Sequence, residues 1–384
     1  MKKINISQLL NGEYEPEASD KAVPDFAYSP LNLLGQLYTP IIDKQFLNEG
    51  HSKPVWPEGK PFAVCLTHDV DAVSEFNIAQ NFRSILKLVR SNSERPLSER
   101  LRWIIIHKLK IMRGLFGSDD NICKFEQWME IEERVGARST FFFAPEKVEH
   151  PHSSDCMYKY SQLTPYKGQK IPVAELMRIL DAEGWEIGLH PSWNAHANYN
   201  EMKEQKAQIE EQLDHPIESV RQHFLKYDPG QTHLVQHRVG FKYDSTIGFN
   251  DNIGFRRGTS YPYKCHFSET DKSESLLQIP LIVQDGALLL SEKGLRLDPD
   301  SALDYIKQIL GAVKEVGGVL TLSWHPHTIK IPGFLSLYER ALELIAKEDP
   351  WFGTVAEVGN WWNESVDIDL VEFTSDRIKT KKSI

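Results

Sequence analysis

The sequence is short of cysteine, of long apolar runs and of basic charge, and each shortage narrows the possible folds and functions. The 384 residues include only four cysteines, which form neither a CxxC pair nor a dense set: Cys65, Cys123, Cys156 and Cys265. This spacing argues against a disulfide scaffold and fits buried, reduced thiols in the cytoplasm. No stretch approaches the roughly eighteen apolar residues of a membrane-spanning helix, and the first residues lack the apolar core of an export signal. We therefore predict a cytoplasmic protein.

Basic side chains are outnumbered by acidic ones. The chain has 44 Lys and Arg against 54 Asp and Glu, a net charge of −10, which argues against a nucleic-acid partner. At 41% hydrophobic and 26% charged residues, the composition is that of a globular protein with a large core. No GxGxxG motif follows the first predicted strand, so nothing indicates a dinucleotide site.

Short apolar runs alternate with helix-period segments from about residue 61 onward. This alternation is typical of βα units around a parallel sheet and predicts an α/β barrel of seven or eight strands, with an open doubly wound sheet as the alternative. The predicted strands are Phe62–Leu66, Ser139–Phe143, Trp185–Leu189, Ser219–His223, Phe241–Asp244, Leu276–Val283, Val319–Trp324 and Gly353–Ala356.

Three regions fall outside the barrel predicted for residues 61–364. Residues 1–60 have little periodicity and are expected to pack on the barrel as an irregular leader, and residues 365–384 read as a polar tail. The third region is a helical insert after the first strand, at residues 74–118. Up to residue 117 it has nine basic and three acidic side chains, a local charge of +6. Two interpretations stay open: a helical hairpin packed on the barrel, or a peripheral contact with anionic lipid or an anionic glycan.

Polar side chains follow several of the predicted strands. The sharpest case is Thr67-His68-Asp69-Val70-Asp71, directly after the first strand. Alternation along an extended chain places Asp69 and Asp71 on the same side, close enough for one to bind a cation and the other to accept a proton. The carboxyl ends of barrel strands are where active sites are built. Capping of the loop is the simpler alternative.

Three further strand ends carry histidine. They lie in GWEIGLHPSWN with His190, in VRQHF with Arg221 and His223, and in LSWHPH with His325. Each histidine alone is more simply a hydrogen-bonded structural group. Their recurrence at successive strand ends indicates one shared site.

In order and type, these motifs resemble those of the polysaccharide deacetylase family with NodB homology, over about residues 62–362. The chain looks like a divergent branch in which the first motif reads THDVD. The resemblance implies a distorted (β/α) barrel that binds one divalent metal ion, most simply zinc, and removes an N-acetyl group from an amino sugar.

The resemblance also implies roles for single residues. Asp69 matches the general base, Arg221 the arginine that orients it, and His325 the general acid. Val70 stands where the family has its second aspartate, so Asp71 is the expected substitute as metal ligand beside His190.

The second metal histidine of the family is replaced here by Asn194, whose amide oxygen is a weaker ligand for zinc. Asn194 completes the predicted ligand set. Three alternatives stay open: His196 reaches the metal, a harder cation replaces zinc, or the site holds no ion.

The remaining predicted site residues rest on position alone. Asp285 ends a strand and is expected to fix the tautomer of His325. The residues expected to contact a carbohydrate substrate are Trp193, His223, Trp324 and Arg256. For the tryptophans core packing is the alternative, and for Arg256 a solvated turn.

We therefore expect a hydrolase of a carbon–nitrogen bond in a glycan or glycan precursor. The alternatives are a catalytically silent carbohydrate-binding relative and a hydrolase of another non-peptide C–N bond. The sequence does not indicate an oligomeric state.

Overall fold

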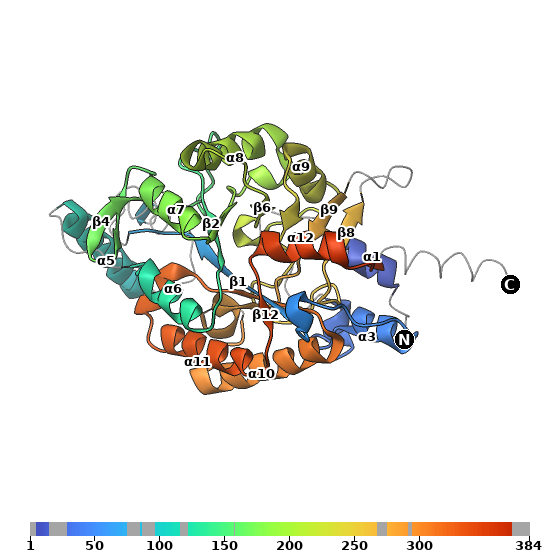
Figure 1. Ribbon diagram of the computed structural model, residues 1–384. Coiled ribbons are helices and arrows are strands. Elements are labelled where there is room, and N and C mark those ends of the chain that lie inside the picture. Colours follow the sequence, from blue (N-terminus) through green and yellow to red (C-terminus); the bar gives the residue numbers. More distant parts are fainter. Residues whose placement is uncertain are drawn as a thin grey trace.

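The structure is a computed structural model that describes residues 5–14, 29–74, 85–86, 97–115, 122–156, 158–266, 275–290 and 294–370. In this part of the chain, helices surround a curled, mostly parallel sheet (Figure 1). Its strands pair in the order β10-β11-β1-β2-β5-β6-β7-β9-β8, and β12 also pairs with β1. The predicted distorted (β/α) barrel is confirmed. Within the described residues, no pairing between β10 and β8 closes the sheet.

The strands of this sheet are β1 (Ala63–Val70), β2 (Thr140–Phe143), β5 (Glu186–Leu189), β6 (Ser219–Val220), β7 (Tyr243–Asp244), β8 (Tyr263–His266), β9 (Ser275–Gln278), β10 (Val283–Gln284), β11 (Val319–Ser323) and β12 (Trp351–Phe352). Strand β8 pairs antiparallel with β9. A separate antiparallel hairpin consists of β3 (Leu163–Tyr166) and β4 (Gln169–Pro172).

The α-helices are α1 (Ile6–Asn11), α2 (Pro30–Leu33), α3 (Ile41–Asn48), α5 (Leu97–Leu115), α6 (Phe125–Arg134), α7 (Val173–Ala182), α8 (Tyr199–Leu213), α9 (Thr232–Val239), α10 (Pro299–Val316), α11 (Phe334–Ala346) and α12 (Val355–Ser365). None of the helices in the described residues is both long and apolar enough to cross a membrane.

Strand β1 lies at the centre of the fold and extends past its predicted end at Leu66. It is hydrogen-bonded to β11 and β2, and all eight of its residues are buried. Partners inside the protein satisfy the polar groups of the extension, since the Thr67 hydroxyl donates to the Leu322 carbonyl at 2.6 Å. This extension carries Asp69 within the strand and leaves Asp71 directly after it.

His68 is a structural residue of the THDVD motif. Its two ring nitrogens lie 2.7 Å from the Trp324 carbonyl and 2.7 Å from the Glu132 carboxylate. The Tyr338 hydroxyl donates to the same oxygen of Glu132 at 2.5 Å. This buried network joins β1 to α6 and α11.

Two predicted strands were placed wrongly. At Gly353–Ala356 the chain is turning into α12, because Thr354 and Glu357 form a capping box; the strand is Trp351–Phe352. The run Leu276–Val283 is interrupted between β9 and β10, where Pro280 provides no backbone donor for a ladder.

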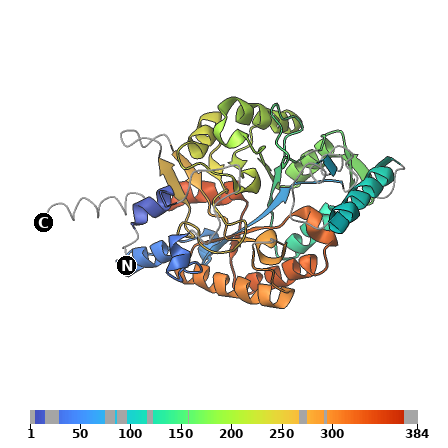
Figure 2. The same cartoon turned by 180° about the vertical axis from the view of Figure 1, so that it is seen from behind.

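The leader packs against the barrel through α3 and the segment after it. The Asp43 carboxylate accepts hydrogen bonds from the Ser260 amide and hydroxyl, both at 2.7 Å, and from the Thr259 hydroxyl. The Trp56 indole donates to the Gly317 carbonyl at 2.8 Å. In Figure 2, α1 and α3 lie on one side of the molecule and α5 lies on the other. The β1 arrow points toward the α5 side.

Of the predicted insert at 74–118, the structure describes Ser74, residues 85–86 and α5. The helix lies at the edge of the molecule in both ribbon views (Figures 1 and 2). The predicted tail is described only to Leu370.

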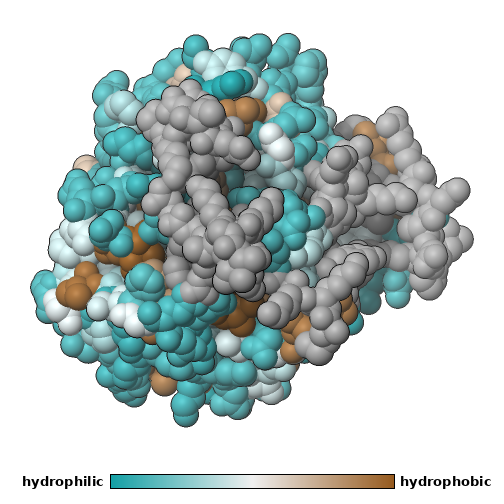
Figure 3. Space-filling view, turned by 90° about the vertical axis from the view of Figure 1, so that its right-hand side faces the viewer, coloured by the Kyte–Doolittle hydropathy of each residue, from teal (hydrophilic) through white to brown (hydrophobic). Residues whose placement is uncertain are grey.

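Figure 3 shows the face of the molecule that lies at the right of Figure 1. The coloured residues on this face are mainly hydrophilic, with small separate apolar groups.

Candidate active site

Asp69 and Arg221 form a buried ion pair between β1 and the end of β6. The Arg221 Nη1 lies 3.0 Å from Asp69 Oδ1, and both side chains are almost fully buried. Burial alone would raise the pKa of Asp69, but the charges of Arg221, His190 and His325 outweigh it and lower the pKa below the usual value. Asp69 is therefore held as a carboxylate.

The orientation of Arg221 is fixed on several sides. Its guanidinium donates to the Ser245 carbonyl, to the Ser245 hydroxyl and to Thr67 Oγ1. The guanidinium also lies 4.7 Å from the centre of the Phe142 ring. Phe142 fits there because Gly188 has no side chain: a Cβ would stand 2.6 Å from that ring. The glycine of the GWEIGLH segment thus makes room for Phe142, on whose ring the guanidinium of Arg221 packs.

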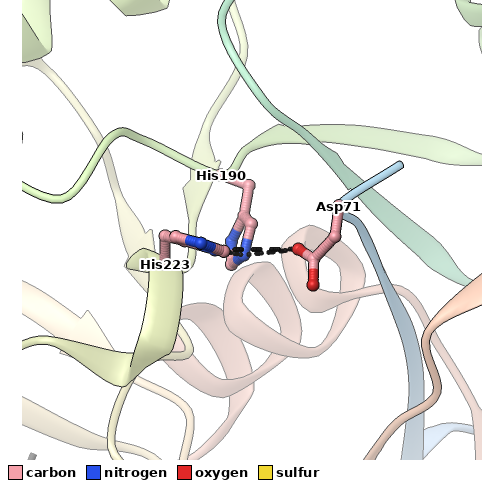
Figure 4. Close-up of side chains that lie close together, drawn as sticks. All are labelled: Asp71, His190 and His223. Atoms are coloured by element: carbon pink, nitrogen blue, oxygen red, sulfur yellow. Dashed lines mark hydrogen bonds and ion pairs between the residues drawn. The ribbon is translucent and has the colours of Figure 1, made fainter. Parts of the chain in front are cut away.

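Asp71, His190 and His223 point toward one another at the carboxyl ends of β1, β5 and β6 (Figure 4). One donor atom from each lies within 4.8 Å of the other two. The Asp71 Oδ1 is 3.4 Å from His190 Nε2 and 3.7 Å from His223 Nδ1, and these two nitrogens are 3.0 Å apart. The three side chains come from distant parts of the sequence and meet only in the fold.

Backbone carbonyls hold both rings from behind. His190 Nδ1 lies 2.6 Å from the Arg221 carbonyl, and His223 Nε2 lies 2.8 Å from the Ser154 carbonyl. A carbonyl oxygen only accepts, so each of these nitrogens carries a proton. In neutral rings, the two nitrogens that face Asp71 are then lone pairs. Metal-binding histidines are commonly oriented in this way.

The electrostatics agree with that protonation state. Burial lowers the pKa of His223 despite the nearby Asp71 charge, so its neutral form is favoured. For Asp71, the three surrounding histidines, His190, His325 and His223, outweigh burial and hold the pKa well below its usual value. The cluster therefore presents one carboxylate and two imidazole lone pairs.

His325 follows β11 and faces Asp71 from the other side. Its Nδ1 lies 2.6 Å from Asp285 Oδ1, and its Nε2 lies 3.7 Å from Asp71 Oδ2. The Thr328 hydroxyl and the His325 amide also donate to Asp285 Oδ2. Burial lowers the pKa of His325, but the carboxylates of Asp285, Asp71 and Asp69 outweigh it and raise the pKa to about 10. Asp285 therefore fixes the ring and favours its protonated form.

These groups line one cavity of about 310 Å³. Asp69, Asp71 and the three histidines form its polar wall, and the rest consists of Phe224, Leu225, Asn250, Gln284, Gly286 and Leu290. Five of the sequence-predicted residues, Asp69, Asp71, His190, His223 and His325, thus share the cavity, with Arg221 and Asp285 in contact behind it.

Comparisons with known proteins were made by sequence and by structure. No family model and no curated protein matches the sequence. Among solved structures, the Puue allantoinase has a TM-score of 0.54 at 16% identity, covering 83% of this chain and 96% of its own. A probable polysaccharide deacetylase from Pseudomonas aeruginosa PAO1 has a TM-score of 0.51 at 16% identity, with the same coverage. A polysaccharide deacetylase-like protein from Mycobacterium smegmatis has a TM-score of 0.50 at 19% identity, and the match covers 81% of this chain and 93% of its own.

The chain has the polysaccharide deacetylase fold. Two of the three metal ligands predicted from the sequence, Asp71 and His190, lie in the cluster, and Asn194 does not. The Asn194 amide donates to the His150 carbonyl at 3.0 Å, and His223 faces Asp71. His196 is also engaged elsewhere, with its Nδ1 3.0 Å from the Trp193 carbonyl. His223, predicted to contact substrate, joins the ligand cluster.

The other predicted substrate contacts do not line the cavity of this deacetylase fold. Trp324 is fully buried in the core, with its ring 5.2 Å from that of Tyr338. Trp193 is 5% exposed and stacks on His152. Arg256 is buried and donates to the Gly248 carbonyl at 2.6 Å, so it does not lie in a solvent-exposed turn. All three are structural groups in this fold.

Phe224 is the aromatic residue that the deacetylase fold places at the cavity. Its ring is 49% exposed and packs edge-on against Trp193 and His223. Phe224 and Leu225 have φ of +56° and +51°, a strained conformation for residues other than glycine. Sequence reasoning could have found Phe224 as a cavity residue from its position directly after His223 in the VRQHF motif. Asn250 and Gln284 gave no such signal, since they lie in no recognisable motif.

Proposed function

We propose that this protein is a metal-dependent hydrolase that removes the N-acetyl group from an amino sugar. The observation that carries the proposal is the pair of imidazole nitrogens, His190 Nε2 and His223 Nδ1, that face each other at 3.0 Å beside Asp71. Two lone pairs at that distance repel each other unless a cation lies near both. A carboxylate and two neutral imidazoles are a donor set suited to zinc.

Asp71, His190 and His223 would hold the ion. When bound, a divalent cation supplies a Lewis acid for the acetyl carbonyl and lowers the pKa of its water from about 15.7 to about 7. The open cavity leaves room for water and substrate beside the three ligands, as catalytic sites require.

Asp69 and His325 divide the proton transfers. Asp69 is ionised and lines the cavity, so it takes the proton of the attacking water as general base. Arg221 keeps it ionised and oriented. His325, protonated and held by Asp285, gives a proton to the departing amine as general acid. Groups positioned in this way contribute about 10²–10⁴-fold each.

The rest of the cavity suits a sugar ring. Phe224 offers an exposed aromatic surface for the apolar face of a pyranose, and Asn250 and Gln284 offer amides to its hydroxyl groups. A cavity of about 310 Å³ is the lower end of the range for small-molecule sites and fits one residue of a longer glycan.

Acetate release from N-acetylglucosamine oligomers, with zinc added and after chelation, tests the proposal. We expect chelation to abolish release and Asp69→Asn to lower turnover by about 10²–10⁴-fold while oligomer binding, measured by calorimetry, is retained. Asp300→Asn, on an exposed helix start, is the matched control. Full turnover after chelation contradicts the metal mechanism. Oligomer binding by the parent chain, with no acetate release whether or not zinc is added, favours a silent carbohydrate-binding relative.

A further inference from the structure

Helix α5 carries a row of exposed apolar side chains. Leu101, Ile105, Leu109 and Met112 are each 51–56% exposed, and we call this row the docking face. At about 100° per residue, the four positions lie within one quarter of the helix circumference. None of residues 98–112 is buried, so within the described part of the chain this face is open to solvent. Exposed apolar surface of this kind marks an interaction site.

Basic residues border the docking face. The helix has five basic residues and one acidic one, Glu99, in a chain with a net charge of −10. Arg102 and Lys108 are exposed and flank the row, one on each side of the helix wheel. Long basic side chains in that position reach phosphate groups while their stems cover apolar surface. The charge thus indicates an anionic partner.

The docking face lies on the side of the molecule where the site opens. The insert connects β1 to α6 and starts at residue 74, three residues after Asp71 and close to the carboxyl end of β1. Both ribbon views show α5 at the edge of the molecule, on the side toward which β1 points (Figures 1 and 2). A surface bound by α5 would therefore lie near the site and away from α1 and α3.

We propose that α5 binds the surface of an anionic phospholipid bilayer, with the docking face among the acyl chains and Arg102 and Lys108 at the phosphates. A second copy of the chain fits poorly, because two α5 helices would bring like charges together. An apolar row bordered by basic residues is the pattern of helices that lie in a membrane interface. The inference is independent of the hydrolase chemistry.

Sedimentation with vesicles tests this inference. We expect the full chain to bind phosphatidylcholine vesicles that contain 30% phosphatidylglycerol, and to bind pure phosphatidylcholine at least tenfold less. The double variant L101E/I105E should bind the anionic vesicles at least tenfold more weakly than the parent chain. L33E/V55E adds the same charge at two other exposed apolar positions and should bind within twofold of the parent chain.

Circular dichroism and urea unfolding check that each variant is folded. Three results would overturn the proposal: no binding of the parent chain to anionic vesicles, equal binding of L101E/I105E, or a parent dimer that this variant dissociates. Because vesicle binding requires no catalysis, failure here leaves the proposed hydrolase function standing, and the reverse also holds.

Discussion

At the level of single residues, His223 rather than Asn194 is the candidate third metal ligand. Its ring reaches the cluster from the end of β6, whereas Asn194 lies beyond β5 and bonds to the His150 carbonyl. Removing an imidazole ligand takes away one of three donors, but truncating Asn194 removes none of them.

We therefore expect His223→Ala to weaken zinc binding by on the order of 100-fold or more. Asn194→Ala should leave the affinity within about twofold of the parent. Competition with a chromogenic chelator measures both constants. If Asn194→Ala caused the larger loss, the ligand set drawn from the structure would be wrong.

Single residues also show which parts of the site were open to sequence reasoning. Asp69, Asp71, His190 and His325 were found because each follows an apolar strand, and parallel strands share one carboxyl edge. His223, predicted as a substrate contact, lies in the cluster and Asn194 lies outside it, because sequence spacing does not show how a chain turns after a strand. The unusual φ angles of Phe224 and Leu225 have no sequence signature.

Among the secondary-structure elements, the His68 network fixes β1 against the helices outside the sheet. Glu132 of α6 accepts from Tyr338 of α11 and lies 2.7 Å from His68 of β1. All three side chains are buried, so a lost partner leaves polar groups without water.

We expect Glu132→Ala to lower the free energy of unfolding by about 2–5 kcal/mol, because it takes the Glu132 partner from His68 Nε2 and from the Tyr338 hydroxyl. Tyr338→Phe removes one hydrogen bond and should cost about 1 kcal/mol. Urea unfolding monitored by tryptophan fluorescence gives both values. Similar losses in the two variants would show that the network does not centre on Glu132.

Strand boundaries were harder to predict than the presence of the central strands. The apolar runs located the central strands, but β1 continued through Thr67, His68 and Asp69, whose polar side chains find partners only in the folded sheet. Hairpin β3–β4 was missed, since its short strands are mostly exposed or polar. A run of apolar residues indicates a buried strand, so it does not locate the polar extension of β1 or the hairpin β3–β4.

Across the whole molecule, Asp43 links the leader to the barrel and makes stability depend on pH. It is fully buried, and burial raises its pKa to about 7 although Thr259 and Ser260 donate to it. The unfolded chain has the ordinary value near 3.8. The contribution of Asp43 to stability is therefore complete below pH 4 and is lost as the pH rises through about 7.

We expect the stability advantage of the parent chain over Asp43→Asn to shrink as the pH rises from 5 to 8. Asparagine is neutral at every pH, so the variant lacks this titration. Thermal melts at the two pH values measure the difference. An unchanged difference would show that the carboxyl titrates alike in folded and unfolded chains.

The placement of the three ligands has a consequence for folding. Asp71, His190 and His223 are far apart in sequence, whereas the close histidine pairs of the chain, His150/His152, His233/His237 and His325/His327, lie outside this cluster. The denatured chain therefore loses the three-donor cluster but keeps short segments that bind zinc, and this competition cancels part of the binding free energy that stabilises the folded state. Each tenfold excess of zinc over the dissociation constant would then add less than the ideal ~1.4 kcal/mol, so the rise in melting temperature would give a lower bound on the affinity of the folded site.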